Sequence, residues 1–209
     1  MLRILIADDH SVVRKGLRQI LLDEFPTAEI AEVADAEELI KNVMAARWDV
    51  VVSDLSMPGR SGMDALQQIK LSYPDLPVLI LSIHPEEQYA IRALKSGASG
   101  YLSKDTAPDE LVKAVKKVLL GKKYISQAIA EKLANTFSSN AAVHQHETLS
   151  DREFDVMKLL ANGKSVSEIA EMLSLSVTTV STYRARVMVK MGLRSNSDLT
   201  KYAIENKLI

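Results

Sequence analysis

The chain has 209 residues, enough for one large domain or two small ones, and 47% of them are hydrophobic. It contains no cysteine, which excludes disulfide scaffolds, thiolate metal sites and cysteine nucleophiles. The net charge of −1 argues against polyanion binding by the whole surface, but residues 149–209 carry 9 Lys+Arg against 7 Asp+Glu, so a local basic face remains possible there.

The first residues of the chain do not resemble a targeting segment. A carboxylate appears already at Asp8, too early for the apolar core of a signal peptide. No apolar run approaches the roughly 20 residues that span a bilayer. We therefore expect a cytoplasmic protein that does not interact with a membrane.

Short apolar runs alternate with longer stretches of helical period over about the first 120 residues. The predicted strands are Arg3–Ala7, Glu29–Val33, Asp49–Ser53, Pro77–Ser82 and Gly100–Leu102. Apolar side chains on both strand faces indicate a sheet that is covered on both sides, hence parallel strands joined by crossover helices.

Five helices are expected between and after these strands, and a sixth follows them. Their ranges are Ser11–Asp23, Ala36–Ala46, Ser61–Ser72, Pro85–Ser96, Ala107–Leu120 and Ser126–Phe137. Ser11 and Thr106 are expected to cap two of them, with Pro108 in a first turn. Five βα units of this length predict an open, doubly wound α/β sheet.

The composition changes near residue 138. Residues 138–147 are polar and aperiodic and are interpreted as a flexible linker. Four short helices are expected after it. The first begins with a capping box at Ser150 and ends at Asn162, the second begins at Ser165 or Ser167, the third runs from Ser176 to Met191, and the fourth begins at Asn196 or Ser197 and ends near Asn206.

Polar side chains follow several of the predicted strands. They are Asp8, Asp9, Asp54, Ser82 and Lys104. Parallel strands end at one edge of the sheet, so these groups are expected to converge. Three carboxylates together need a cation. We expect no histidine or cysteine beside them, so the ligands are hard oxygens and Mg²⁺ fits best. A divalent ion beside a carboxylate and an ammonium group indicates phosphoryl chemistry.

Each of these residues has a simpler interpretation when it is taken alone. An aspartate at a strand end often only caps a helix, and Lys104 can be a solvated surface residue. Their occurrence together at successive strand ends favours a functional site.

These residues resemble the receiver domains of response regulators. Asp8-Asp9, residues 54–59 (Asp-Leu-Ser-Met-Pro-Gly), Ser82, and Lys104 after Tyr101 carry the resemblance over about residues 1–120. The resemblance implies a flavodoxin-like receiver over residues 1–121, with strand order 2-1-3-4-5.

The same resemblance implies a role for each residue at the metal. Asp54 accepts a phosphoryl group from a histidine kinase. Mg²⁺ is held by Asp9, Asp54 and the backbone carbonyl of Ser56, and through water by Asp8.

The resemblance also implies how the phosphoryl group is sensed. Lys104 pairs with its oxygens, Ser82 donates a hydrogen bond to it, and Tyr101 follows between exposed and buried rotamers. Tyr101 can equally be a static aromatic residue on an edge strand. Ser56 and His84 can flank the phosphoryl group, or His84 can be a simple exposed loop residue.

The third helix of the tail is the candidate for nucleic-acid binding. Val180, Val187 and Met191 recur at helical spacing and should pack inward, with Tyr183 or Arg184 between them. The candidate DNA contacts are Thr178, Thr179, Ser181, Thr182, Arg184, Ala185, Arg186 and Lys190. Small hydroxyls permit close approach to base edges, and cations supply phosphate or guanine contacts. Taken alone, the segment also fits a helix with a solvated face.

The tail resembles the LuxR-type helix-turn-helix domain of the NarL/FixJ subgroup. Residues 149–156, 161–165, 168–170, 175–176, 179–180 and 190–193 carry the resemblance. It implies a DNA-binding domain over residues 149–209, preceded by a helix and linker over residues 122–148. Thr178, Ser181 and Tyr183 stand where lysine or histidine is common, so weak single-domain affinity and reliance on dimers are expected.

The last helix has two interpretations. In the family it helps the DNA-binding domains to dimerise. Leu199, Tyr202, Ala203 and Leu208 can serve that contact or complete the core of the helical bundle.

Three functions fit these features. The leading hypothesis is a two-component transcriptional regulator in which phosphorylation of Asp54 switches homodimerisation and binding to double-stranded promoter DNA. A phosphatase that uses Asp54 as nucleophile would need a second aspartate where Ser56 stands. We therefore predict a stoichiometric phosphoacceptor with slow self-dephosphorylation rather than an enzyme. The third possibility is a DNA-binding protein with an idle receiver.

Overall fold

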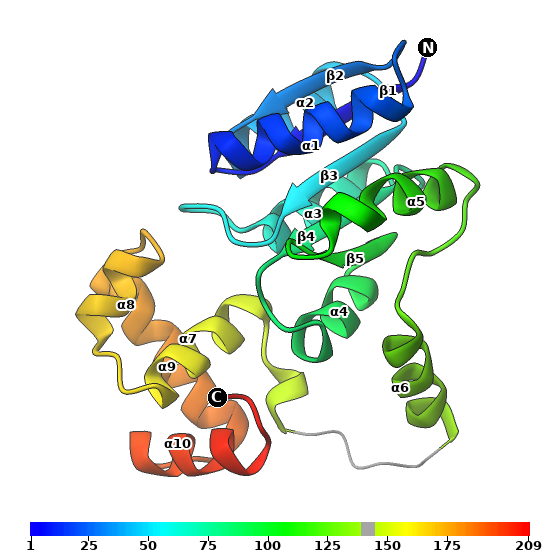
Figure 1. Cartoon of the computed structure of the whole chain (residues 1–209). Helices are drawn as coiled ribbons and strands as arrows, with labels where there is room; N and C mark the ends of the chain where they lie inside the picture. Colours follow the sequence, from blue (N-terminus) through cyan, green and yellow to red (C-terminus); the bar gives the residue numbers. More distant parts are fainter. Residues whose placement is uncertain (139–144) are drawn as a thin grey trace. The chain divides into compact units, whose positions relative to one another are not determined.

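A computed structural model describes residues 1–138 and 145–209, apart from the side chains of residues 132 and 134–138. The chain divides into two compact units, Met1–Ser138 and Ser139–Ile209, which are described separately (Figure 1). Of the expected linker, residues 139–144 lie outside the described part. Gln145–Thr148 forms a short 3₁₀ helix, η1, which the polar composition did not predict.

The first unit contains one sheet of five parallel strands in the order β2-β1-β3-β4-β5, which confirms the predicted fold class. The strands are β1 (Arg3–Ala7), β2 (Glu29–Val33), β3 (Val50–Asp54), β4 (Val78–Ser82) and β5 (Gly100–Ser103). Every residue of β3 and β4 is buried, because helices cover both faces of the sheet (Figure 1). The carboxyl ends of β1, β3 and β4 therefore form one edge at which polar side chains collect.

Six helices accompany this sheet. They are α1 (Ser11–Glu24), α2 (Ala36–Ala45), α3 (Gly62–Ser72), α4 (Glu86–Lys95), α5 (Ala107–Leu119) and α6 (Gln127–Ser138). Helices α1 and α5 pack together, as do α2 and α3, and α4 packs along β5 (Figure 1). Each boundary lies within two residues of the predicted one, because the apolar periodicity specifies which residues face the sheet.

Two predicted helix caps are wrong. Helix α1 begins at Ser11, and His10 takes the cap position without a side-chain cap bond. Thr106 does precede α5, but its backbone is helical (φ −96°, ψ −8°), and its hydroxyl does not cap the helix. A capping hydroxyl needs an extended backbone to reach the N–H groups of the first turn.

The second unit is all-helical. Its helices are α7 (Asp151–Ala161), α8 (Val166–Met172), α9 (Val177–Met191) and α10 (Asn196–Glu205). Ser150, Ser165 and Ser195 form capping boxes at the starts of three helices. Gly192 ends α9 in the left-handed conformation, with φ +63°, which glycine adopts readily. Among the described residues, no helix is both long and apolar enough to cross a membrane.

Candidate functional site

An ammonium group joins two buried carboxylates at the carboxyl edge of the sheet. Asp8 follows β1 and is fully buried, and Asp54 ends β3 and is 3% exposed. The Nζ atom of Lys104 lies 2.7 Å from Asp8 Oδ2 and 2.8 Å from Asp54 Oδ2. Residues that are far apart in the sequence therefore meet in one cluster, as their positions at the strand ends predicted.

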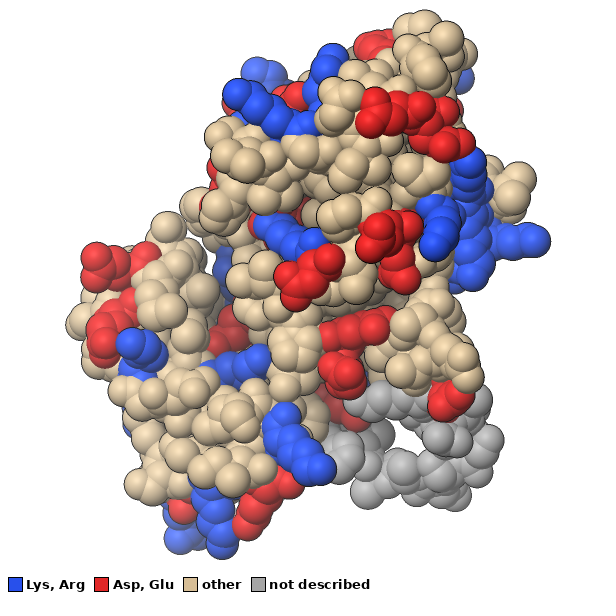
Figure 2. Space-filling model, in the orientation of Figure 1, with Lys and Arg blue, Asp and Glu red and all other residues tan. Residues whose placement is uncertain are grey.

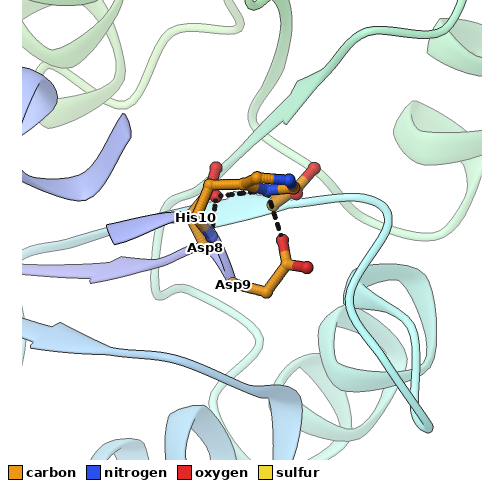
Figure 3. A group of neighbouring side chains, drawn as sticks. Asp8, Asp9 and His10 are labelled. Atoms are coloured by element: carbon orange, nitrogen blue, oxygen red, sulfur yellow. Dashed lines mark hydrogen bonds and ion pairs between the residues drawn. The ribbon is translucent and has the colours of Figure 1, made fainter. Parts of the chain in front are cut away.

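Asp9 and His10 complete this cluster. The Nδ1 atom of His10 lies 2.7 Å from Asp9 Oδ1 and 3.4 Å from Asp8 Oδ1 (Figure 3). The expectation that no histidine lies beside the carboxylates is therefore wrong. The backbone N–H of His10 donates to Asp8 Oδ1 at 2.8 Å, and this turn brings the imidazole against both carboxylates.

The carboxylate cluster is suited to a cation. One ligand atom from each of Asp8, Asp9, His10 and Asp54 lies within 4.8 Å of all the others. Asp8 Oδ2 and Asp9 Oδ1 are buried and accept no well-aligned hydrogen bond from the described residues, although the ammonium and imidazole lie at ion-pair distance. Carboxylates that lie this close together repel one another, and a metal ion would offset that repulsion.

Burial and charge act in opposite directions on the central pair. Burial raises the pKa of the Asp54 carboxyl above its usual value, and the hydrogen bonds from Lys104 and Ser56 offset this only in part. Burial would lower the pKa of the Lys104 ammonium, but the two carboxylates outweigh that effect and raise it. Lys104 is therefore held in its charged form beside Asp54.

Gly62, which was not predicted from the sequence, lies in close contact with the backbone of Asp54. A Cβ atom on Gly62 would lie 1.9 Å from the carbonyl oxygen of Asp54, so only glycine permits this close approach. The N–H of Gly62 also donates to the carbonyl of Leu55 at 2.9 Å. In the sequence, the signal that could have identified Gly62 is its position directly after Ser61, the residue that caps α3.

Four further predicted residues form a connected group beside the carboxylate cluster. The Ser82 hydroxyl oxygen accepts a hydrogen bond from the His84 N–H at 3.0 Å. The hydroxyl of Tyr101, which is buried, donates to the His84 carbonyl at 2.9 Å. Ser56 Oγ and His84 Nε2 lie 2.9 Å apart, and the imidazole stacks on Tyr89. His84 therefore links the loop after β3 to the loop after β4.

Helix α9 presents one buried and one exposed face. Val180, Val187 and Met191 are buried, as predicted. Of the predicted DNA contacts, Thr179 and Arg184 are half-buried. The exposed ones are Thr178, Ser181, Thr182, Ala185, Arg186 and Lys190. The exposed face is therefore made mostly of small side chains.

Two hydroxyls on α9 are engaged within the helix itself. Thr182 Oγ1 donates to the carbonyl of Thr178 at 3.0 Å. Thr179 Oγ1 lies 2.7 Å from the Oγ of Ser176, whose side chain caps the helix. These small residues therefore allow a ligand to approach α9 closely, and their hydroxyls contribute less to hydrogen bonding with it.

Four residues in and after α10 could either contact a partner or complete the core, and they lie mainly in the core. Leu199 and Ala203 are fully buried and Leu208 is 5% exposed. Tyr202 is half-buried, and its hydroxyl lies 2.9 Å from His146 Nδ1 in η1. These contacts favour completion of the bundle core.

The charges of the described surface are mixed in sign. Figure 2 shows Lys and Arg side chains interspersed with Asp and Glu on the face in view. This agrees with the net charge of −1 and gives no broad basic face on that side. On the face in view, contact with a polyanion would therefore depend on a few local cations.

A doubly wound sheet with this acidic cluster, followed by a small all-helical unit, is the arrangement of the response-regulator class. Residues 4–116 match the family model of the response regulator receiver domain, and residues 147–203 match the bacterial regulatory proteins of the luxR family. The chain therefore belongs to the two-component response regulators of the NarL/FixJ type, which join a receiver to a LuxR-type DNA-binding domain.

Relatives of the same organisation match the whole chain. The oxygen regulatory protein NreC of Staphylococcus aureus is 37% identical over 215 aligned residues, which cover 100% of this chain and 99% of NreC. RcsB of Salmonella enterica serovar Typhimurium, solved with the promoter rprA and the phosphomimetic BeF3−, is 29% identical with a TM-score of 0.63, covering 97% of this chain and 98% of RcsB.

A second RcsB structure contains two dimers bound to two parallel DNAs. It is 29% identical to this chain with a TM-score of 0.59, and it covers 96% of this chain and 97% of RcsB. The likeness therefore extends over both units and not over the receiver alone.

Proposed function

We propose that Asp54 accepts a phosphoryl group from a sensor histidine kinase in a Mg²⁺-dependent reaction, and that this switches dimerisation and promoter binding. The observation that carries the proposal is the Lys104 ammonium, which lies 2.8 Å from Asp54 and 2.7 Å from Asp8. A fixed cation beside a carboxylate neutralises the oxygens of an incoming phosphoryl group.

The residues that would hold Mg²⁺ are Asp9, Asp54 and the backbone carbonyl of Ser56, with Asp8 acting through water. The convergence of ligand atoms from Asp8, Asp9 and Asp54 within 4.8 Å of one another supports this assignment. Bound Mg²⁺ supplies positive charge that offsets the repulsion among the carboxylates and the phosphoryl oxygens.

The chain's own groups then act on the transferring phosphoryl group. An Asp54 carboxylate oxygen attacks phosphorus, the O–P bond forms, and the N–P bond of the kinase phosphohistidine breaks with its electron pair left on the histidine nitrogen. Lys104 pairs with the new charge. The Ser82 oxygen accepts from the His84 N–H. Its hydroxyl would turn to donate a hydrogen bond to a phosphoryl oxygen.

His84 and Tyr101 connect this event to the rest of the receiver. A Ser82 hydroxyl drawn toward the phosphoryl group changes its bond to the His84 N–H, and the carbonyl of the same residue accepts from Tyr101. The rotamer of Tyr101 would respond to the phosphoryl group in this way.

The receiver would act as a stoichiometric acceptor and not as a turnover enzyme. The position two residues after Asp54 is Ser56, which has no carboxylate to serve as acid and base for rapid hydrolysis. Slow self-dephosphorylation would reset the switch.

The DNA-binding part of the proposal rests on α9 lying in the major groove. The structures of RcsB with promoter DNA and as DNA-bound dimers support it by likeness. The proposed segments are a receiver over residues 1–121, a helix and linker over residues 122–148, and a DNA-binding domain over residues 149–209. A cytoplasmic location follows from the function, because the kinase and the promoter are reached there.

A phosphodonor experiment tests the proposal. The full chain with Mg²⁺ and a small-molecule phosphodonor should gain a phosphoryl group and bind DNA selected from a random pool more tightly. Asp54→Ala should take up no phosphoryl group and show no gain. Equal DNA binding with and without donor would sink the phosphate switch and favour an idle receiver. Steady phosphate release from a generic substrate would instead favour a phosphatase.

A further inference from the structure

The three cations of α9 differ in their partners within the helical unit. The Nζ atom of Lys190 lies 2.6 Å from Oε2 of Glu153 in α7. The Nε of Arg184 donates to Oδ1 of Asn196, at the start of α10, at 3.1 Å. Arg186, within the described part of the chain, makes neither a hydrogen bond nor an ion pair. Two cations therefore hold α9 against its neighbours, and one is left for a ligand.

Arg186 lies on the part of α9 that can approach another surface closely. It is exposed, and the small side chains of Thr182 and Ala185 precede it by four residues and by one. Arg186 and Ala185 also line a shallow hollow together with Val189, which is 81% exposed. Because Thr182 and Ala185 are small, they leave room for the Arg186 side chain to reach into a DNA groove.

We propose that Arg186 reads a guanine in each half of the operator, whereas Arg184 and Lys190 position the helix. This inference rests on the proposed DNA-binding function and specifies its sequence preference. The planar guanidinium presents two N–H donors that match the O6 and N7 acceptors of guanine in the major groove. Arg184 and Lys190 have part of their donor capacity already engaged by Asn196 and Glu153.

Selection from random DNA with the full, donor-treated chain tests this assignment. The wild type should select a guanine at one position in each half-site. Arg186→Gln should lose that guanine or exchange it for adenine, because a glutamine amide pairs with adenine N6 and N7. Arg184→Gln is the matched comparison, with the same substitution two residues away. Because Arg184 positions the helix, this variant should bind all sequences more weakly and still select the wild-type guanine. Circular dichroism establishes that both variants are folded.

A change in the DNA provides the second readout. Replacing the selected guanine by 7-deazaguanine, which lacks N7, should weaken wild-type binding on the order of ten-fold. It should leave the binding of Arg186→Gln unchanged, because the variant makes no contact with N7. Tolerance of 7-deazaguanine by the wild type would overturn the inference.

Two other outcomes distinguish a failure of this inference from a failure of the proposed function. If Arg186→Gln binds all sequences more weakly but selects the same guanine, Arg186 contacts phosphate and the inference is wrong, while the proposed function stands. If the wild type selects no sequence at all, the proposed DNA-binding function fails and the inference fails with it.

Discussion

Gly62 shows how closely the backbone is packed around the carboxylate cluster. The space that a Cβ atom would need is occupied by the carbonyl oxygen of Asp54, 1.9 Å away. The position of the Lys104 ammonium is fixed as well, because it lies between the buried carboxylates of Asp8 and Asp54. A single methyl group or a single charge at these positions therefore decides whether Asp54, the proposed phosphoacceptor, keeps its position.

Gly62→Ala should therefore impair both stability and phosphorylation. Moving the backbone of Asp54 should cost about 1–3 kcal/mol in free energy of unfolding and slow phosphoryl uptake. Gly16→Ala is the control, because Gly16 lies in α1 with no atom within 4 Å of its Cβ position, and it should stabilise by up to about 1 kcal/mol. Denaturant unfolding and the rate of donor-driven phosphorylation measure the two effects. Equal stability of the two variants would contradict the packing argument.

Among the elements, α7 and α9 are joined by an ion pair between the buried Glu153 and the exposed Lys190. Glu153 is 2% exposed, accepts a hydrogen bond from the Ser150 N–H at 2.8 Å, and pairs with Lys190. Burial alone would raise the pKa of the Glu153 carboxyl, but the hydrogen bonds from Lys190 and Ser150 outweigh it and hold the pKa below its usual value. The capping box and the interhelical contact therefore share one carboxylate.

This lowered pKa gives the helical unit a pH-dependent stability. Because the folded state favours the ionised carboxyl, the stabilisation is present above the unfolded-state pKa and is lost as the pH falls through the lower folded-state pKa. Glu153→Gln should destabilise the chain at pH 7 by about 1–3 kcal/mol and reduce the loss of stability on acidification.

Thermal unfolding of the full chain at pH 7 and in mild acid measures this effect. Glu168→Gln is a suitable control, since Glu168 occupies the same position of a capping box on α8 but is exposed. A Glu153→Gln variant as stable as the wild type at pH 7 would show that the ion pair contributes nothing.

For the whole molecule, the proposed function requires a contact between two copies on DNA. Leu199, Ala203 and Leu208 are buried within their own unit and are not available to a partner. The exposed apolar residue of α10 is instead Ile204, at 61%, beside the polar side chains of Thr200 and Lys201. We therefore expect Ile204 to contribute to the contact between DNA-binding domains.

Ile204→Lys should weaken cooperative binding to a two-half-site operator and leave binding to a single half-site unchanged. Leu71→Lys, in which an apolar residue that is 87% exposed on α3 is replaced, is the matched control and should behave as the wild type. Gel-shift titrations on one and two half-sites separate the two effects. Unchanged cooperativity of the Ile204 variant would place the dimer contact elsewhere.

The sequence by itself determined the elements and their order. Local periodicity and capping motifs specify helices and strands without long-range information, so the boundaries of β1 and β2 and the capping box at Ser150 could be predicted. The pocket could be predicted as well, because parallel strands bring Asp8, Asp54 and the other strand-end residues to one edge.

Only the tertiary structure decided the contacts made between elements. The turn that places His10 on Asp9, and the ion pair that engages Lys190, join side chains whose directions depend on backbone angles and packing. The burial of Leu199 is decided in the same way, since an apolar helix stripe fits a core and a dimer contact equally well. Sequence patterns specify which residues can meet, and three-dimensional packing selects the pairs that do.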